Sequence, residues 1–307
     1  MRAVVYTRYG PPEVLRLTDI PKPTPRDDEV LVKVHATTVT IGDCRMRAFS
    51  VPKGMWLPSR LYLGVFHPRR KILGMELAGE VEATGRNVTR FKPGDAVFAS
   101  TMEVNFGGYA EYKCFPETGV LAIKPSTIDF NEAAAAWGGA VTALHCLHKG
   151  KLNAGQSILV YGASGAVGTS AIQFARNLFD AEVTGVCGPA NQDLVHSLGA
   201  RHTIDYTQQD FSRLSERYDV VFDAVGRFPA DRARLALKPG GTYLNVHRDA
   251  RAGRNSTPQQ DIQRLKDLLE AGVYRPVIDR VYPLEQIVEA HRYVEAGHKR
   301  GNVVITI

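Results

Sequence analysis

The chain has few cysteines, no long apolar run and no dense block of one charge. Its four cysteines, Cys44, Cys114, Cys146 and Cys187, lie far apart without a Cys-x-x-Cys pair, which excludes a disulfide framework and a zinc knuckle. No stretch reaches the ~18 apolar residues of a membrane-spanning helix. The chain begins with a strand pattern instead of a secretion signal, so we expect a soluble, cytoplasmic protein without a membrane partner.

The charge balance is mildly basic. Lys and Arg number 38 against 32 Asp and Glu among 307 residues, a net charge of +6. The excess is spread along the chain, and its longest cluster is Arg69-Arg70-Lys71. This distribution fits an anionic cofactor and disfavours nucleic acid as a partner, because binding a polyanion needs a denser basic tract.

The most informative segment is a strand, a glycine turn and an apolar helix within residues 157–176. Apolar residues 158–161 lead into the turn, and a helical pattern follows Gly168. Gly165 lets the backbone approach a pyrophosphate, and Gly168 lets the helix pack closely on its strand. The free N–H groups of the helix start would face the anion. The pattern predicts a dinucleotide-binding site.

The organisation of the chain predicts an α/β protein with two domains. Proline and glycine divide the first ~125 residues into short strands, which is typical of a barrel-like unit. Strands and helices then alternate, as in a doubly wound parallel sheet. The β-branched strand 302–307 needs neighbours on both sides, so we expect it to return to the first unit. The expected domains are residues 1–125 with 272–307, and residues 126–271, with a polar, mobile stretch at 248–260.

Six segments, in this order and spacing, resemble the medium-chain dehydrogenase/reductase superfamily, within it the zinc-independent quinone oxidoreductase (zeta-crystallin-like) branch. The resemblance implies a GroES-like catalytic domain, a Rossmann domain, a cleft between them and NAD(P)H as hydride carrier. The segments are Leu73–Val81, Phe91–Val97, Gly107–Tyr112, the phosphate loop, Leu198–Ala200 and Phe222–Gly226.

The resemblance also implies that the chain holds no zinc. Zinc-dependent members place their catalytic ligands at the positions of Thr40, Met75 and Gly138, none of which supplies a thiolate, imidazole or carboxylate. The cysteine-rich lobe of those members is missing between Ser100 and Cys114. Without a Lewis acid, the acceptor must provide its own electron sink, as a quinone or an α,β-unsaturated carbonyl does. A binding protein that uses the nucleotide only to lock its shape is the alternative hypothesis.

The resemblance carries site residues onto this sequence. The expected catalytic residues are Thr40, near the substrate carbonyl, and Thr142, beside the nicotinamide; each also has a structural interpretation, which for Thr142 is a hydroxyl bonded back to its own helical turn. The expected cofactor contacts are Thr142, Gly162, Ser164, Gly165, Ala166, Val167, Gly168, Cys187, Gly188, Arg201, Tyr206, Val225, Asn245, Gly301 and Asn302. The expected substrate cleft comprises Thr40, Trp56, Tyr62, Met75 and Trp137.

The end of the second strand of the Rossmann domain favours NADPH, with NADH as the alternative. Cys187 and Gly188 stand where an NAD-selective site has an acidic residue, so nothing there repels a 2′-phosphate. Relatives follow with an arginine that binds the phosphate, but Ala190 occupies its place. Arg201 and Tyr206 are expected to compensate in part.

Two further regions depart from relatives. Residues 49–71 interleave aromatic and basic residues, which is compatible with a packed helical excursion, a lining for a bulky apolar acceptor, or RNA contacts. Residues 246–261 are shorter than in relatives and lack the strand that usually pairs two subunits. A homodimer is possible, but its usual edge strand is missing.

Overall fold

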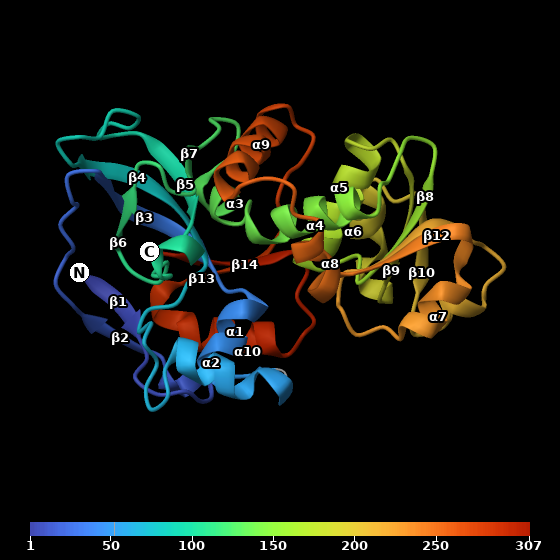
Figure 1. The fold of residues 1–307 in the computed structure, drawn as a ribbon, viewed down its shortest axis with the longest axis horizontal. Coiled ribbons are helices and arrows are strands. Elements are labelled where there is room, and N and C mark those ends of the chain that lie inside the picture. Colours follow the sequence, from blue (N-terminus) through green and yellow to red (C-terminus); the bar gives the residue numbers. More distant parts are fainter. Residues whose placement is uncertain (52) are drawn as a thin grey trace. The chain divides into compact units, whose positions relative to one another are not determined.

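The computed structural model describes residues 1–51 and 53–307. Contacts divide the chain into two units, Met1–Trp137 with Ile278–Ile307, and Gly138–Val277 (Figure 1). Residues 126–137 belong to the first unit, because α3 (Phe130–Ala134) packs on β3 and β4. The division therefore falls 12 residues later than expected at the first boundary and 6 residues later at the second, since 137 − 125 = 12 and 277 − 271 = 6.

The first unit is built on a mostly antiparallel seven-stranded sheet of order β13-β14-β3-β4-β5-β7, with β6 also paired to β3, and on a small β1-β2 ribbon. Val30, Val32 and Val34 alternate along β3 and are buried, as their period of two predicts. The strands are β1 (Arg2–Val5), β2 (Arg16–Asp19), β3 (Glu29–Thr38), β4 (Glu76–Thr84), β5 (Ala96–Ser100), β6 (Tyr112–Pro116), β7 (Leu121–Ile123), β13 (Ile278–Pro283) and β14 (Asn302–Thr306). The other helices of this unit are α1 (Ile41–Ala48), α2 (Trp56–Leu63) and α10 (Ile287–Glu295).

The C-terminal strand returns to the first unit, as expected. β14 pairs in parallel with β13 and antiparallel with β3, and Val303, Val304 and Ile305 are fully buried. A strand with neighbours on both sides and an apolar surface on both faces matches its β-branched sequence.

The second unit is a five-stranded, wholly parallel sheet of order β10-β9-β8-β11-β12. This arrangement confirms the predicted α/β class with a Rossmann-type sheet. Its strands are β8 (Ser157–Tyr161), β9 (Glu182–Cys187), β10 (His202–Asp205), β11 (Tyr218–Asp223) and β12 (Leu237–Asn245). Its helices are α4 (Gly138–Lys149), α5 (Ala166–Asn177), α6 (Gln192–Ser197), α7 (Ala230–Leu235), α8 (Val246–Ala252) and α9 (Pro258–Glu270).

The polar stretch at 248–260, which was expected to be mobile, lies largely in two helices, α8 and α9. Residues 246–252 form α8, whose N-terminus is capped by the Asn245 side chain accepting from His247 N–H. α8 packs on α4, and Gly253 lies so close to His145 that a Cβ on it would stand 2.0 Å from the His145 carbonyl oxygen.

Among the described residues β12 is an edge strand of this sheet. Whether two copies of the chain pair through this edge is not tested. No helix in the described ranges is long and apolar enough to cross a membrane.

Candidate functional site

The carboxyl ends of the parallel strands form one edge in the second unit. The strand registers place Asp205 beside Cys187, and Asp223 beside both Tyr161 and Asn245. Ligands of open parallel sheets bind outside this edge. Most of the expected cofactor contacts of this unit lie on the loops that leave it.

The glycine turn between β8 and α5 has the geometry of a pyrophosphate site. Gly162 has a positive φ of 79°, and a Cβ on it would lie 2.4 Å from Val225 Cγ2. A Cβ on Gly168 would lie 2.2 Å from the Gly162 carbonyl oxygen, whereas one on Gly165 would meet nothing closer than 3.6 Å. No side chain caps the start of α5, where Ser164, Ala166 and Val167 complete the turn. The turn therefore leaves open space and a helix N-terminus for an anion.

The loops after β9 and β10 meet this turn. Asn191 Nδ2 donates to Ser164 Oγ at 3.3 Å, and Tyr206 N–H donates to the Cys187 carbonyl at 3.3 Å. Gly188 lies beside the Tyr206 ring, since a Cβ on it would stand 3.5 Å from the Tyr206 hydroxyl. The structure thus brings Ser164, Cys187, Gly188 and Tyr206 together. Asn191 was missed as a site residue, although it stands in the run that binds phosphate in relatives.

Arg201 is not part of this cluster. It precedes β10, at the amino-terminal edge of the sheet, and its guanidinium pairs with Glu182 at 3.2 Å. β10 runs from His202 to Asp205 and separates Arg201 from Tyr206 by the length of the strand. The expected contact of Arg201 with the cofactor is therefore withdrawn.

Asp205 is a second residue that sequence reasoning missed. Its Oδ1 accepts from Thr207 N–H and Oγ, while its buried Oδ2 has no hydrogen-bond partner among the described residues. Burial, with Asp205 as a second cause, raises the pKa of the Cys187 thiol to about 11. A carboxylate therefore lies next to the position where an NAD-selective site would carry its acidic residue.

The loop after β11 is held by a buried carboxylate. Asp223 accepts backbone N–H bonds from Val225, Gly226 and Phe228 at 2.8 to 3.0 Å. Asn245 Nδ2 donates to the same carboxylate at 3.3 Å. Val225 and Asn245 are thus fixed at the carboxyl edge, where they were expected.

Thr142 lies in α4, and its hydroxyl donates to the Gly138 carbonyl at 2.8 Å. This is the bond of the structural interpretation. α4 also packs against the start of α5, because a Cβ on Gly139 would lie 2.7 Å from the Ala166 carbonyl oxygen. The helix that carries Thr142 therefore adjoins the glycine turn, and the hydroxyl oxygen of Thr142 keeps its acceptor capacity.

In the first unit, Thr40 and Asp43 form a capping box at the start of α1. Thr40 Oγ1 accepts from Asp43 N–H at 3.1 Å, and it donates to Asp43 Oδ2 at 2.6 Å. Asp43 Oδ1 accepts from Gly74 N–H at 2.9 Å, so the carboxylate joins α1 to the segment before β4. Complete burial raises the pKa of Asp43. The hydroxyl proton of Thr40 is thus already engaged by a carboxylate.

Thr40 and Met75 are neighbours, as the positions of two zinc ligands would be. Thr40 Oγ1 lies 3.5 Å from Met75 Sδ. A hydroxyl and a thioether are poor donors for zinc, which takes thiolate, imidazole and carboxylate. In the part of the chain that the structure describes, no three His, Cys, Asp or Glu residues are arranged to hold a metal. The Trp137 side chain, also expected in the cleft, is buried at the end of the first stretch of this unit.

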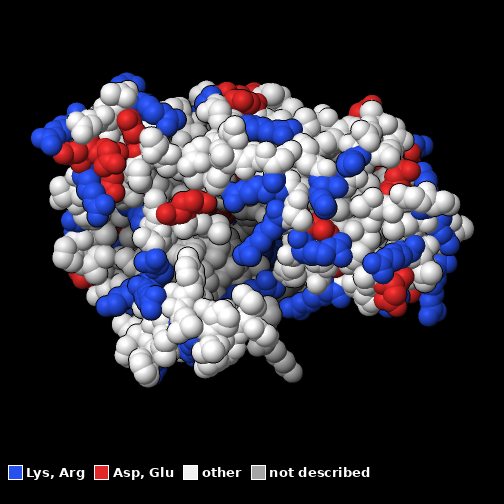
Figure 2. All heavy atoms as spheres, in the orientation of Figure 1, with Lys and Arg blue, Asp and Glu red and all other residues white. Residues whose placement is uncertain are grey.

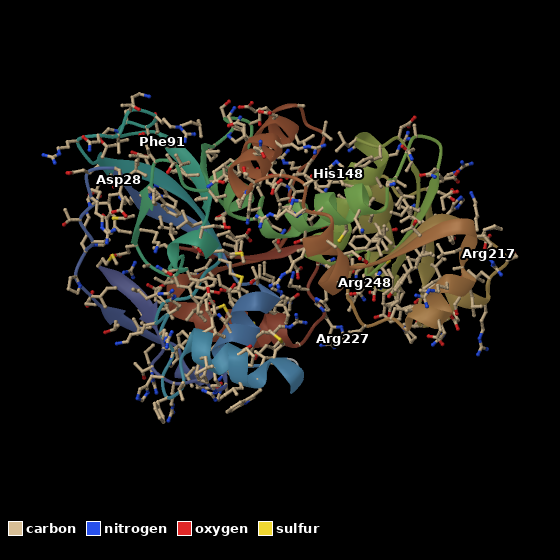
Figure 3. All side chains as sticks on the ribbon, in the orientation of Figure 1. Asp28, Phe91, His148, Arg217, Arg227 and Arg248 are labelled. Carbon is tan, nitrogen blue, oxygen red and sulfur yellow. The ribbon has the colours of Figure 1, made fainter. Side chains whose placement is uncertain are left out.

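Trp56 and Tyr62 are not enclosed. Both lie on α2, which has no buried residue, and their exposed fractions are 53% and 70%. The expectation of a helix in residues 49–71 is correct, but the helix is packed only in part: Trp56 contacts Phe49 and Arg60, whereas most of the apolar side chains of α2 are exposed. Figure 3 shows the side chains along this helix.

Gly301 and Asn302 stand at the start of β14, and Gly301 has a φ of 61°. Lys299 Nζ donates to the Gly301 carbonyl. Burial lowers the pKa of Lys299 to about 8, although Glu76 and Asp279 act in the opposite direction. An amine with a lowered pKa therefore adjoins this expected cofactor contact.

Comparisons with known proteins agree with these features. Residues 26–125 match the family model of the alcohol dehydrogenase GroES-like domain, and residues 198–305 match that of the zinc-binding dehydrogenases. The chain is 32% identical to a chloroplastic NADPH-dependent alkenal/one oxidoreductase of Arabidopsis thaliana, over 99% of this chain and 79% of the relative. It is 31% identical to the human quinone oxidoreductase, over 97% and 94% of the two chains. The structure of a Coxiella burnetii quinone oxidoreductase matches with a TM-score of 0.84, 28% identity, and coverage of 100% and 99%.

Fold and site together define an oxidoreductase of the medium-chain dehydrogenase/reductase superfamily that takes a nicotinamide cofactor. Within that superfamily, the chain belongs to the quinone oxidoreductase branch.

Gly165 and Gly168 should respond differently to alanine. Gly168→Ala places a Cβ 2.2 Å from a backbone oxygen, so we expect a loss of roughly 1–3 kcal/mol in unfolding free energy. Gly165→Ala meets open space, so stability should hold while NADPH affinity falls about tenfold, because the Cβ enters the space of the pyrophosphate. Urea unfolding and NADPH titration measure the two effects. Normal NADPH affinity in Gly165→Ala would show that phosphate binds elsewhere.

Lys299 should make stability rise with pH above pH 8. Its pKa is about 8 in the folded chain against an ordinary lysine value of 10.5, so the unfolded chain binds more protons between these values. The wild type should therefore gain stability relative to Lys299→Met as pH rises from 7.5 to 9.5. Urea unfolding at several pH values measures this difference, with Lys71→Met as the exposed control. A difference independent of pH would contradict the burial of the amine.

Proposed function

We propose that this protein is an NADPH-dependent, zinc-independent oxidoreductase that reduces a quinone or an α,β-unsaturated carbonyl. One observation carries the proposal: a complete pyrophosphate turn is combined with a hydroxyl and a thioether at positions where zinc-dependent relatives bind their metal. The names of the relatives support the same substrate classes.

The chain's own residues would bind and orient the cofactor. The backbone from Gly165 to Gly168 would hold the pyrophosphate at the start of α5. Ser164, Asn191 and Tyr206, which lie on adjoining loops, would contact the 2′ substituent. When bound, the nicotinamide supplies a hydride.

The acceptor requires little stabilisation from the protein. Hydride addition to a conjugated carbonyl leaves an enolate or hydroquinone anion, which modest hydrogen bonding stabilises. Because Thr40 already donates to Asp43, we assign Thr40 a role in positioning the loop before α1. The remaining contribution of the protein is orientation and the exclusion of water.

A substrate panel tests this function. We expect the absorbance of NADPH at 340 nm to fall when a p-quinone or a 2-alkenal is added. It should stay constant with the saturated aldehyde of the same chain length. Because no good zinc ligands stand at the catalytic positions, the rate should persist in a chelator, and elemental analysis should find far less than one zinc per chain. NADPH binding without turnover of any acceptor would instead support a binding protein, and activity lost on chelation would refute zinc independence.

Cofactor choice should depend on the loop after β9. The Asp205 carboxylate would repel a 2′-phosphate, and position 190 carries an alanine where relatives have the arginine that binds this phosphate. The preference for NADPH over NADH should therefore be modest. Ala190→Arg should raise that preference at least tenfold, since a charge-assisted contact contributes about 1.5–3 kcal/mol. Gly188→Asp should favour NADH, because its Cβ fits beside Tyr206 and its carboxylate would repel the phosphate.

The matched control is Arg201→Ala, at the opposite edge of the sheet, which should leave the ratio of the two dissociation constants unchanged. A shift in that ratio on Arg201→Ala, or tighter binding of NADH than of NADPH by the unmodified protein, would contradict this account.

A further inference from the structure

The segment from Met55 to Phe66 exposes an unusual amount of apolar surface. It holds seven of the fifteen exposed large apolar side chains among the described residues, and we call these seven the α2 patch. Phe66 is 85% exposed and Tyr62 is 70% exposed. Figure 2 shows a mostly uncharged surface over α2, at the lower left. The members of the α2 patch are Met55, Trp56, Leu57, Leu61, Tyr62, Val65 and Phe66.

The sequence on both sides of the α2 patch carries charges of one sign. From Cys44 to Met75 the sequence contains seven Lys and Arg residues and no Asp or Glu. Arg69 and Lys71 follow the patch directly, are exposed, and form no ion pair in the described part of the chain. The patch is thus adjacent to basic residues and remote in sequence from acidic ones.

The α2 patch is anchored to the first unit from beneath by aromatic contacts. The Arg60 guanidinium lies over the rings of Phe49, Tyr9 and Trp56, at 4.0, 4.7 and 5.4 Å from their centroids. Arg60 Nη1 also donates to the Val65 carbonyl at 3.2 Å, and Tyr9 Oη donates to the Gly64 carbonyl at 3.3 Å. These contacts hold the helix while its outer residues face solvent.

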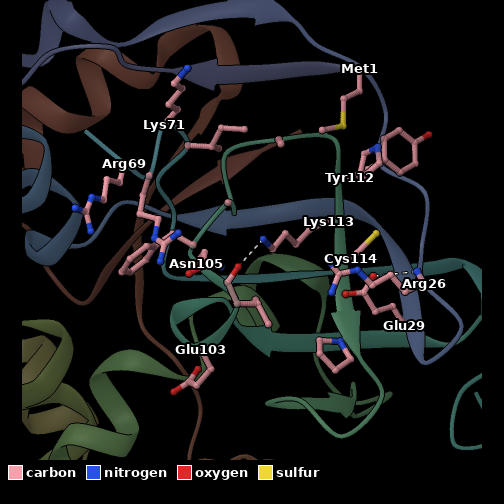
Figure 4. A pocket seen from close by; sticks show the side chains of 18 residues that line it. Met1, Arg26, Glu29, Arg69, Lys71, Glu103, Asn105, Tyr112, Lys113 and Cys114 are labelled. Carbon is pink, nitrogen blue, oxygen red and sulfur yellow. Dashed lines mark hydrogen bonds between the residues drawn. The ribbon is translucent and has the colours of Figure 1, made fainter. Parts of the chain in front are cut away.

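A basic cavity of about 650 Å³ is lined in part by residues 69–72, which follow this segment in the sequence (Figure 4). Arg69, Arg70 and Lys71 line it together with Arg26 and Lys113, against the carboxylates of Glu29 and Glu103. Glu29 accepts from Arg26 N–H, and Glu103 accepts from Ser100 Oγ. Burial, with Arg70 contributing, lowers the pKa of Lys113. The cavity therefore has an excess of cations that suits an anionic group.

We propose that the α2 patch and the Arg69-Arg70-Lys71 cluster bind the surface of an anionic lipid bilayer. Trp, Tyr, Phe and Leu next to Lys and Arg are the residues that bind at a membrane interface, where rings enter the headgroup region and cations meet lipid phosphates. A partner protein would need only the apolar residues, whereas the run of Lys and Arg without Asp or Glu from Cys44 to Met75, and the excess of cations in the cavity, match a negatively charged surface. This binding is peripheral, and it revises the expectation of no membrane partner.

Vesicle binding tests the proposal with a reporter that the chain already contains. The two tryptophans are Trp56, half exposed in the α2 patch, and Trp137, which is buried. Vesicles of phosphatidylcholine with 30% phosphatidylserine should co-sediment the full chain and shift the Trp56 emission to the blue. Pure phosphatidylcholine should bind it at least tenfold more weakly. Trp56→Phe should abolish the shift while most of the binding remains.

Substitutions separate the apolar and the basic contributions. Leu61→Ser with Phe66→Ser should weaken vesicle binding at least tenfold, whereas Leu235→Ser, 59% exposed on α7, should not. Arg69→Gln, Arg70→Gln and Lys71→Gln should each weaken binding to anionic vesicles about fivefold and reduce its salt dependence. Circular dichroism and NADPH titration confirm that each variant is folded.

Three results would overturn the proposal. The first is no co-sedimentation and no change in Trp56 emission with anionic vesicles. The second is equal binding to neutral and anionic vesicles. The third is a dimer in light scattering that Leu61→Ser with Phe66→Ser dissociates while vesicles bind neither form, which would make the α2 patch a contact between two copies of the chain.

Discussion

The close packing of α5 on the carbonyl of Gly162 is the contact on which the cofactor site depends. Gly168 makes it by having no side chain, so the helix starts directly beyond the end of β8. The unpaired N–H groups of the first turn then lie at the sheet edge, where other loops converge. Asn191 and Tyr206 acquire their places from this arrangement, since they bond or pack to residues of the turn and of β9.

Buried carboxylates fix the loop around Thr40 in the first unit and the loop after β11 in the second unit. Asp43 binds the N–H groups of Thr40 and Gly74, and Asp223 binds three N–H groups of the loop after β11. Removing either would leave several donors without partners, at about 1–3 kcal/mol for each buried one. Such side chains act on function indirectly, because they hold the backbone of loops whose other residues meet ligands.

Local patterns in the sequence were sufficient for the glycine turn, the strand alternation in β3 and the burial of β14. They failed where the outcome depends on the three-dimensional course of the chain. Arg201 lies far from the glycine turn because it precedes β10, at the amino-terminal edge of the sheet. A sequence motif does not specify at which edge of the sheet a side chain lies. α8 forms because residues distant in sequence pack against it, and polarity alone suggested a loop. The exposure of α2 could not be inferred from its apolar composition, which is typical of a buried helix.

The position of β14 has a consequence for the order in which the chain folds during synthesis. The second unit is one continuous stretch, Gly138–Val277, whereas the sheet of the first unit is completed only by β13 and β14 from the end of the chain. On the ribosome, the second unit can close its parallel sheet while β3 still has an open edge. An unpaired strand edge can pair with strands of other chains. The chain is therefore most prone to aggregation while this edge of β3 is open, until β14 pairs with it.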